Sequence, residues 1–191
     1  MRKLVILFLI ISAGHSAWPQ DGKDFIVLTN GDTLPCLVWS WKNGSLFSKP
    51  KVTVDTGDGL YLSYSTREII AFTKGDSIFW SIPFRPWKKG SNKMVWAQVI
   101  MKNKNHYFLK YENVIQAEMG PHYELVYYYY RGSNFVEEIS NGNCREILEK
   151  YFSDCPYIRD LLTKKRNFFR NDRISKVADE YRERCCGDTK F

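Results

Sequence analysis

Histidine is the first residue type to consider, because its side chain exchanges protons near neutral pH and binds metals. The sequence contains three histidines, and His15 lies in its apolar N-terminal segment. Neither His106 nor His122 belongs to a motif such as HExxH, in which spacing on a helix creates a zinc site. A lone histidine beside a turn is typical of a protein surface. We therefore predict no histidine-based catalysis and no metal site.

Paired carboxylates are the second chemistry to consider, since two of them can hydrolyse a glycosidic bond. Glu137 and Glu138 are adjacent in a predicted strand, so their side chains point to opposite faces and cannot act on one bond. Asp179 and Glu180 fall on the solvent side of a predicted helix. The chain also lacks a GxSxG elbow, a Walker-type glycine loop and a CxxC pair. We predict no catalytic residue and no cofactor; the alternative is a hydrolase with a site assembled from scattered carboxylates and histidines.

Two basic clusters, at residues 85–93 and 164–170, raise the question of nucleic acid. Phe168 and Phe169 lie among the cations of the second cluster, a combination that suits single-stranded nucleic acid. The formal net charge of +7 is moderate, however, and cations are interleaved with carboxylates along most of the chain. That pattern is typical of a solvated surface, so we predict no nucleic-acid partner.

Aromatic residues carry the binding hypothesis. Tyr127–Tyr130 are four consecutive tyrosines in a predicted strand, which places Tyr128 and Tyr130 on one face. Trp39 and Trp41 alternate in an earlier strand, which likewise predicts a shared face. Exposed rings with hydroxyl or NH tips suit sugars or peptides, whereas buried ones would fill a second core or form cross-strand pairs. These four side chains are the predicted ligand-binding residues, and an envelope protein or a glycan is the predicted class of partner.

Five cysteines are present, and their placement predicts one disulfide. A helix between Cys144 and Cys155 would separate their Cα atoms by about 16 Å, beyond the ~7 Å limit for a bond. A short connection makes the second and third predicted helices antiparallel and brings Cys155 near Cys185 and Cys186. We predict a bond from Cys155 to one of these two, with Cys185 preferred because it lies on an apolar stripe. The alternative of reduced core cysteines stays open.

The elements that position these residues begin with the segment Phe25–Trp41. Two apolar runs there flank Asn30-Gly31, and Asn-Gly favours the type I′ turn of a hairpin. Alternating apolar patterns separated by short turn signals predict further strands up to about residue 140. Short connections favour an antiparallel β meander, bent into partly open barrel-like sheets. The prolines and basic run at 83–93 predict a long loop or a subdomain boundary.

From Asn141 the apolar period changes from 2 to 3.6, which indicates amphipathic helices. Three apolar stripes follow: the first begins at Cys144, the second follows Ser153-Asp154, and the third is capped by Asn171. Helices gathered beside an antiparallel sheet make an α+β fold. The predicted organisation is a signal peptide over 1–20, a β-rich domain over 21–140 and a helical segment over 141–191 that packs on the sheet.

The first 20 residues have the pattern of a secretory signal peptide. Arg2-Lys3 precede an apolar run, Leu4–Ile11, and small residues follow. The run is shorter than the roughly 20 residues that span a bilayer. We expect cleavage between Gly14 and Gln20, with Asp21 as the first mature residue. The mature chain is then exported, without a transmembrane span, to the periplasm, the outer membrane or the outside of the cell.

Three segments resemble a recurring type of exported protein of Bacteroidetes-like bacteria: IVLTNGDTL, TREIIAF and EKYFSDCPYIRDLL. Those relatives typically begin with a strand–NGDT–strand hairpin after the signal peptide and end with a YF-x-DCP helical tail. This chain departs where Pro35 and Cys36 stand near a usual glycine. The resemblance implies export and a shared fold, and it brings no assigned activity. Together these observations favour an exported, non-catalytic binding or cell-envelope-associated protein of unknown ligand.

Overall fold

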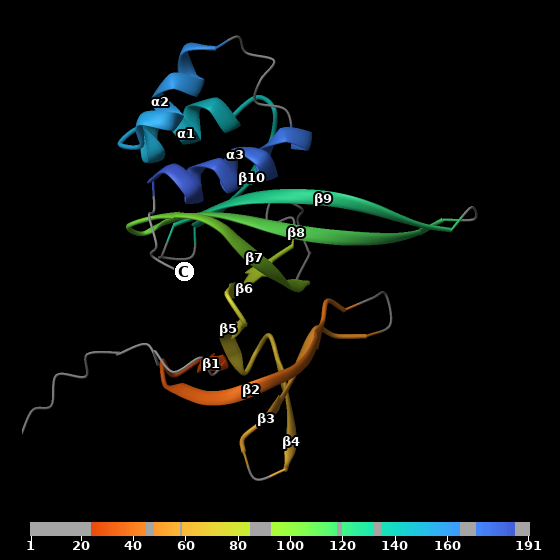
Figure 1. Ribbon diagram of the computed structural model, residues 1–191. Coiled ribbons are helices and arrows are strands. Elements are labelled where there is room, and N and C mark those ends of the chain that lie inside the picture. The colour runs from red at the N-terminus through yellow and green to blue at the C-terminus, as the bar shows by residue number, and fades with distance from the viewer. Residues whose placement is uncertain are drawn as a thin grey trace, which may run out of the picture.

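A computed structural model describes residues 24–44, 48–57, 59–84, 93–117, 120–131, 135–164 and 171–185. Within these ranges an antiparallel sheet is followed by three helices, which confirms the predicted α+β fold (Figure 1). The predicted signal peptide and Cys186 lie outside the described residues. None of the helices in the described ranges has the length and apolar character needed to cross a membrane.

Ten strands form one open sheet in the order β10-β9-β8-β7-β6-β5-β1-β2-β3-β4. Their bounds are β1 (Asp24–Leu28), β2 (Thr33–Lys42), β3 (Lys51–Asp55), β4 (Tyr61–Ser65), β5 (Ile69–Lys74), β6 (Ser77–Pro83), β7 (Met94–Asn103), β8 (His106–Ala117), β9 (Gly120–Arg131) and β10 (Phe135–Ile139). All neighbouring strands are antiparallel. The sheet is a meander with one exception, because β1 pairs with both β2 and β5.

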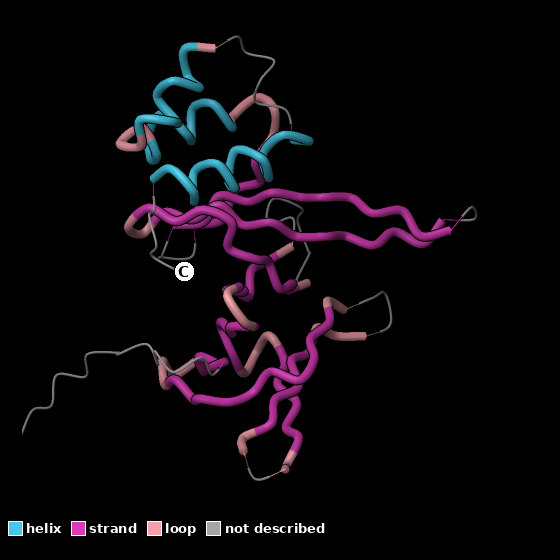
Figure 2. The backbone as a smooth tube through the Cα atoms, viewed as in Figure 1, coloured by secondary structure: helices cyan, strands magenta, loops and turns pink. Residues whose placement is uncertain are grey.

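Pairing is continuous through the ten strands, and Figure 2 shows the two ends of the sheet one above the other. Strands β1 to β4 form the lower part, and β7 to β9 lie under the helices in the upper part. Strands β6 and β7 pair directly, with Pro83 opposite Met94, so the sheet is continuous across the loop predicted at 83–93. Residues 85–92 of that loop lie outside the described residues.

Asp24 is a buried charged residue that ties β1 to its neighbours on both sides. Its Oδ2 accepts a hydrogen bond from the Val38 amide at 3.0 Å, and its Oδ1 accepts one from the Gly75 amide at 2.8 Å. The Lys74 ammonium lies 3.8 Å from Oδ2 and donates to the Val38 carbonyl. A buried carboxylate is stabilised only when it is paired and hydrogen-bonded, and here both conditions hold. Asp24 thereby joins β2 to the β5–β6 turn.

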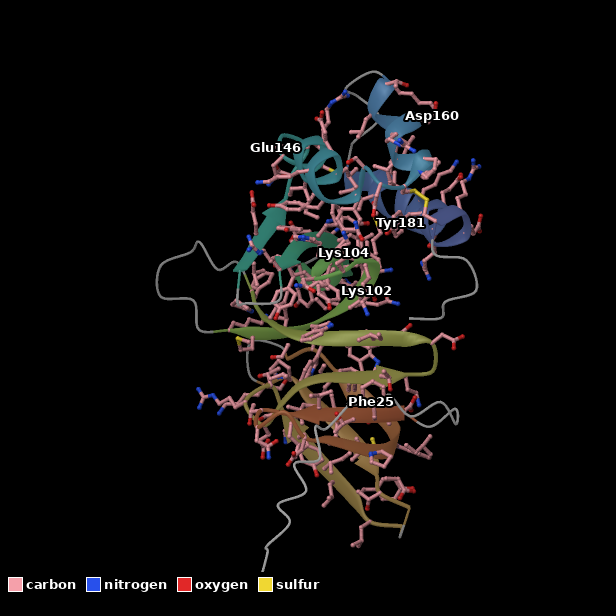
Figure 3. The ribbon with its side chains drawn as sticks, turned by 90° about the vertical axis from the view of Figure 1, so that its left-hand side faces the viewer. Phe25, Lys102, Lys104, Glu146, Asp160 and Tyr181 are labelled. Atoms are coloured by element: carbon pink, nitrogen blue, oxygen red, sulfur yellow. A yellow bond between two sulfur atoms is a disulfide. The ribbon has the colours of Figure 1, made fainter. Side chains whose placement is uncertain are left out.

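The helices are α1 (Cys144–Phe152), α2 (Pro156–Thr163) and α3 (Asn171–Cys185). They pack on the sheet, because residues of the helices and of β7, β8 and β9 share one core cluster. The Tyr181 hydroxyl of α3 donates to the Lys102 carbonyl at 3.0 Å, and the Tyr127 and Ser175 hydroxyls lie 2.9 Å apart. Cys155 and Cys185 form the predicted disulfide, with Cα atoms 5.6 Å apart, across the antiparallel helices (Figure 3).

Strands β8 and β9 form one long hairpin. Strand β8 runs without a break through the adjacent apolar residues Val114 and Ile115 to Ala117. Strand β9 begins at Gly120, which pairs with Ala117 and whose φ of 110° suits glycine. In Figure 1 the far end of β8 and β9 extends beyond the helices. The exposed apolar side chains of this extension are Val114, Ile115, Tyr123 and Leu125.

Candidate functional site

The two tryptophans predicted to share a face lie on opposite sides of the sheet. Strand β2 carries a β-bulge between Val38 and Ser40, so Trp39 is an extra residue without a partner in the register with β3. Beyond the bulge Trp41 pairs with Val52, which is fully buried. A bulge adds one residue to a strand, and every later side chain then changes face. The prediction of a shared face is therefore wrong.

Trp41 turns toward the lower core. Its ring centroid lies 4.7 Å from that of Phe79 and 6.1 Å from that of Phe72. Phe72 in turn stacks on Phe79 at 4.7 Å and meets Trp96 edge-on at 5.2 Å. Offset and edge-on contacts of this kind stabilise aromatic pairs. The ring of Trp41, which is 38% exposed, thus packs at the edge of the core cluster that contains Phe72 and Phe79.

Trp39 stands on the opposite, solvent side with Tyr61 of β4. Their ring centroids are 5.6 Å apart with the planes at 72°, and 63% of Trp39 and 55% of Tyr61 are exposed. Leu37, 52% exposed, belongs to the same cross-strand row, because it pairs with Asp55 and Asp55 pairs with Tyr61. These three apolar side chains form one end of a surface on β2, β3 and β4.

The middle of that surface carries hydroxyl groups. Ser40 pairs with Thr53, and Thr53 pairs with Ser63. The Thr53 and Ser63 hydroxyl oxygens are hydrogen-bonded at 3.1 Å on the exposed side. Each hydroxyl both donates and accepts, so this row offers further hydrogen bonds of either polarity.

The other end of the surface is basic. Lys42 pairs with Lys51, and Lys51 pairs with Ser65. The backbone amide and the hydroxyl of Ser65 donate to the Glu68 carboxylate at 2.8 and 2.7 Å, which lowers the pKa of Glu68. We call the whole surface the outer face; it consists of Leu37, Trp39, Ser40, Lys42, Lys51, Thr53, Asp55, Tyr61, Ser63 and Ser65.

Of the two tyrosines predicted to bind a ligand, Tyr128 is inside the protein and Tyr130 is partly buried. Tyr128 is fully buried on the sheet face away from the helices, with Leu109 and Val126 in the same core cluster. Tyr130 packs at the edge of that cluster, its ring 5.5 Å from that of Trp80. Tyr128 therefore presents no ring to solvent and takes the alternative role, that of a second core.

His106 joins a cluster of rings between the sheet and α1. Its Nδ1 lies 2.6 Å from the Tyr129 hydroxyl, and its ring stacks on Tyr151 at 4.3 Å. Burial lowers the pKa of His106, and the positive charges of Arg131 and Lys104 lower it further. Burial raises the pKa of the Tyr129 hydroxyl, because it disfavours the charged form of each group and tyrosine is charged when deprotonated. These contacts of His106 link β8 and β9 to α1.

The other candidate residues make local contacts. Asn143 donates to Glu137 at 2.8 Å, Arg182 lies 2.5 Å from Asp179, and Glu180 lies 2.9 Å from Arg184. In the part of the chain that the structure describes, no three His, Cys, Asp or Glu side chains are grouped to hold a metal ion. The basic clusters at 85–93 and 164–170 lie mostly outside that part.

Comparison with known proteins adds no relative to this description. No family model, no curated protein and no solved structure matches the chain. The resemblance to exported proteins of Bacteroidetes-like bacteria remains a prediction.

Proposed function

We propose that the protein is an exported, non-catalytic binding protein and that its ligand is a glycan held on the outer face. The observation that carries this proposal is the Trp39–Tyr61 pair. Both rings are more than half exposed, and they contact each other on the side of the sheet away from the core. Exposed clusters of large apolar side chains mark interaction sites more often than isolated ones do.

The chemistry of the outer face favours a sugar. A pyranose ring has an apolar face of C–H groups and a rim of hydroxyls. The rings of Trp39 and Tyr61 can pack on the C–H face of the sugar. The hydroxyls of Ser40, Thr53 and Ser63 can donate to and accept from its hydroxyl rim.

A peptide fits the arrangement less well. A peptide that adds to a sheet binds along the free edge, through backbone hydrogen bonds of the outermost strand. Trp39 belongs to β2, which has β1 on one side and β3 on the other, so that only Tyr61 of this pair belongs to an edge strand, β4. The rings and hydroxyls stand on the face of the sheet, where a flat polysaccharide chain can lie across three strands.

Export is supported by two features. The N-terminal pattern is that of a signal peptide, and disulfides such as Cys155–Cys185 are typical of oxidising compartments. The periplasm, the outer membrane and the exterior all meet this condition, and all of them contain polysaccharide.

The test is retention of the mature chain on immobilised bacterial envelope polysaccharides. Trp39→Ala and Tyr61→Ala should each weaken retention by at least about tenfold, because burying one exposed ring contributes about 1.5–3 kcal/mol. Leu125→Ala is the matched control, since Leu125 is also exposed, at 44%, but lies on the β8–β9 hairpin. Equal retention of the wild type and both aromatic variants would contradict the proposal.

A further inference from the structure

The basic end of the outer face contains a pairing that the fold does not need. Lys42 and Lys51 are directly opposite each other on neighbouring strands, and both are exposed. Like charges in this position destabilise a sheet. Within the described residues, neither lysine has a carboxylate within salt-bridge distance. Residues that lower the stability of a fold are expected at positions that serve function.

We propose that the glycan is anionic and that its carboxylate, phosphate or sulfate group lies between Lys42 and Lys51. This inference rests on the proposed function, because it assigns the charge of the ligand at the same surface. Two ammonium groups at one spot provide charge-assisted hydrogen bonds to such a group, and its negative charge would relieve their repulsion.

The nearby carboxylates are already hydrogen-bonded. Asp55, at the aromatic end, accepts from the Gly57 amide at 2.8 Å and so belongs to the turn after β3. Glu68 is held by the two Ser65 donors; these are the main causes of its lowered pKa, and Lys51 is the last. The Lys51 ammonium therefore keeps hydrogen-bond donors for a ligand, although its charge also acts on the Glu68 carboxylate.

The spacing along the outer face indicates a polymer. Lys51, Thr53 and Asp55 lie on one side of β3, so the basic and aromatic ends are separated by about 13 Å at 3.3 Å per residue. One sugar ring cannot contact both ends. A chain with repeated acidic groups can place one sugar on Trp39 and Tyr61 and the acidic group of another between the lysines.

The experiment compares dextran with dextran sulfate, which share a backbone and differ in charge, and adds polygalacturonate as a carboxylate polymer. Lys42→Gln/Lys51→Gln is the test variant. Lys102→Gln/Lys104→Gln is the matched control, because it removes the same charge from two exposed lysines at the end of β7 and in the turn that follows, in the upper part of the molecule (Figure 3). Titration calorimetry at low and at physiological salt gives the affinities.

We expect wild type to bind at least one of the two acidic polymers more tightly than dextran, and the preference to shrink with salt. The test variant should bind that polymer about tenfold more weakly, and the control variant should bind as wild type does. Trp39→Ala should also weaken binding, which a purely ionic attraction would not require. Thermal melting should show that the test variant is at least as stable as wild type, since a repulsion has been removed.

Three results would overturn the inference without touching the proposed function. In the first, the test and control variants bind the acidic polymer equally weakly; in the second, the test variant binds it as tightly as wild type does. In the third, wild type binds dextran as tightly as dextran sulfate. In each case Trp39→Ala must still lose binding. Acidic-polymer binding that Trp39→Ala leaves unchanged would instead overturn both. The choice between the sulfate and the carboxylate polymer identifies the acidic group.

Discussion

Trp39 and Trp41 are two residues apart on one strand and project from opposite faces of the sheet. The ring of Trp39 meets Tyr61 at 5.6 Å in solvent, whereas that of Trp41 meets Phe79 at 4.7 Å in the core. The β-bulge between Val38 and Ser40 creates the difference. One extra residue thus provides an exposed ring and a packed ring from the same short segment.

This separation predicts opposite effects of two similar substitutions. Trp41→Ala should lower the free energy of unfolding by about 2–4 kcal/mol, since it removes the contacts with Phe72 and Phe79. Trp39→Ala should change it by less than about 0.5 kcal/mol, as at other exposed positions. Urea denaturation measures both. A larger loss in Trp39→Ala would mean that its ring supports the fold.

Tyr128 provides a test of the second core. Tyr128→Ala should cost about 3–5 kcal/mol, because the ring is fully buried among apolar side chains. Retention on polysaccharide, measured on the folded fraction, should not change. A stable Tyr128→Ala protein with weakened retention would move the binding site from the outer face to β9.

Asp24→Asn should destabilise the fold by about 1–3 kcal/mol, because the carboxylate accepts hydrogen bonds from two backbone amides in a buried position. An amide group has one oxygen and cannot accept both bonds as the carboxylate does. Asp179→Asn is the control, since Asp179 is exposed on α3. Comparable stability of the two variants in thermal melting would contradict this role of Asp24.

Reduction of the Cys155–Cys185 bond should lower the free energy of unfolding. The cysteines are 30 residues apart, and the entropy of a loop of that length corresponds to about 3–4 kcal/mol. Cys155→Ser in the absence of reductant should give a similar loss. Peptide mapping without reductant checks the pairing, and alkylation of Cys155 in the native protein would rule it out.

The pKa of His106 predicts a pH dependence of stability. Because that pKa is lowered in the folded state, the unfolded chain binds more protons below about pH 6.5, the ordinary value. Stability from this group is therefore complete above that pH and is lost as the pH falls toward the folded pKa. The melting temperature of wild type should fall further between pH 7.5 and pH 5 than that of His106→Gln. Parallel losses would show that His106 is not the cause.

Local patterns in the sequence were sufficient for the helices, the first hairpin and the disulfide. The apolar stripes of 144–185 and the Asn30-Gly31 signal lie within the elements that they define, so each pattern predicts its own element. The predicted type I′ turn is not formed, because it requires a positive φ at both residues and only Gly31 has one. The bond between Cys155 and Cys185 followed from two helix lengths and a short connection.

Long-range relationships could not be predicted from those patterns. The bulge in β2 depends on how that strand meets β3, and alternation alone placed both tryptophans on one face. The pairing of Lys42 with Lys51 is fixed by the same register. Val114 and Ile115, adjacent apolar residues that are both exposed, broke the alternation and concealed the continuity of β8.

The position of β1 has a consequence for the order in which the sheet is completed. Among the described strands it is the first to be synthesised, yet it is the element that connects β2 with β5. The pairing of Val27 with Ala71 cannot form until the chain as far as β5 is available, whereas β8 and β9 can pair as soon as their own turn is made. Contacts so distant in sequence are slow to form. The two parts of the sheet can therefore each assemble early, while their junction depends on the oldest segment of the described chain remaining unpaired on one edge until β5 arrives.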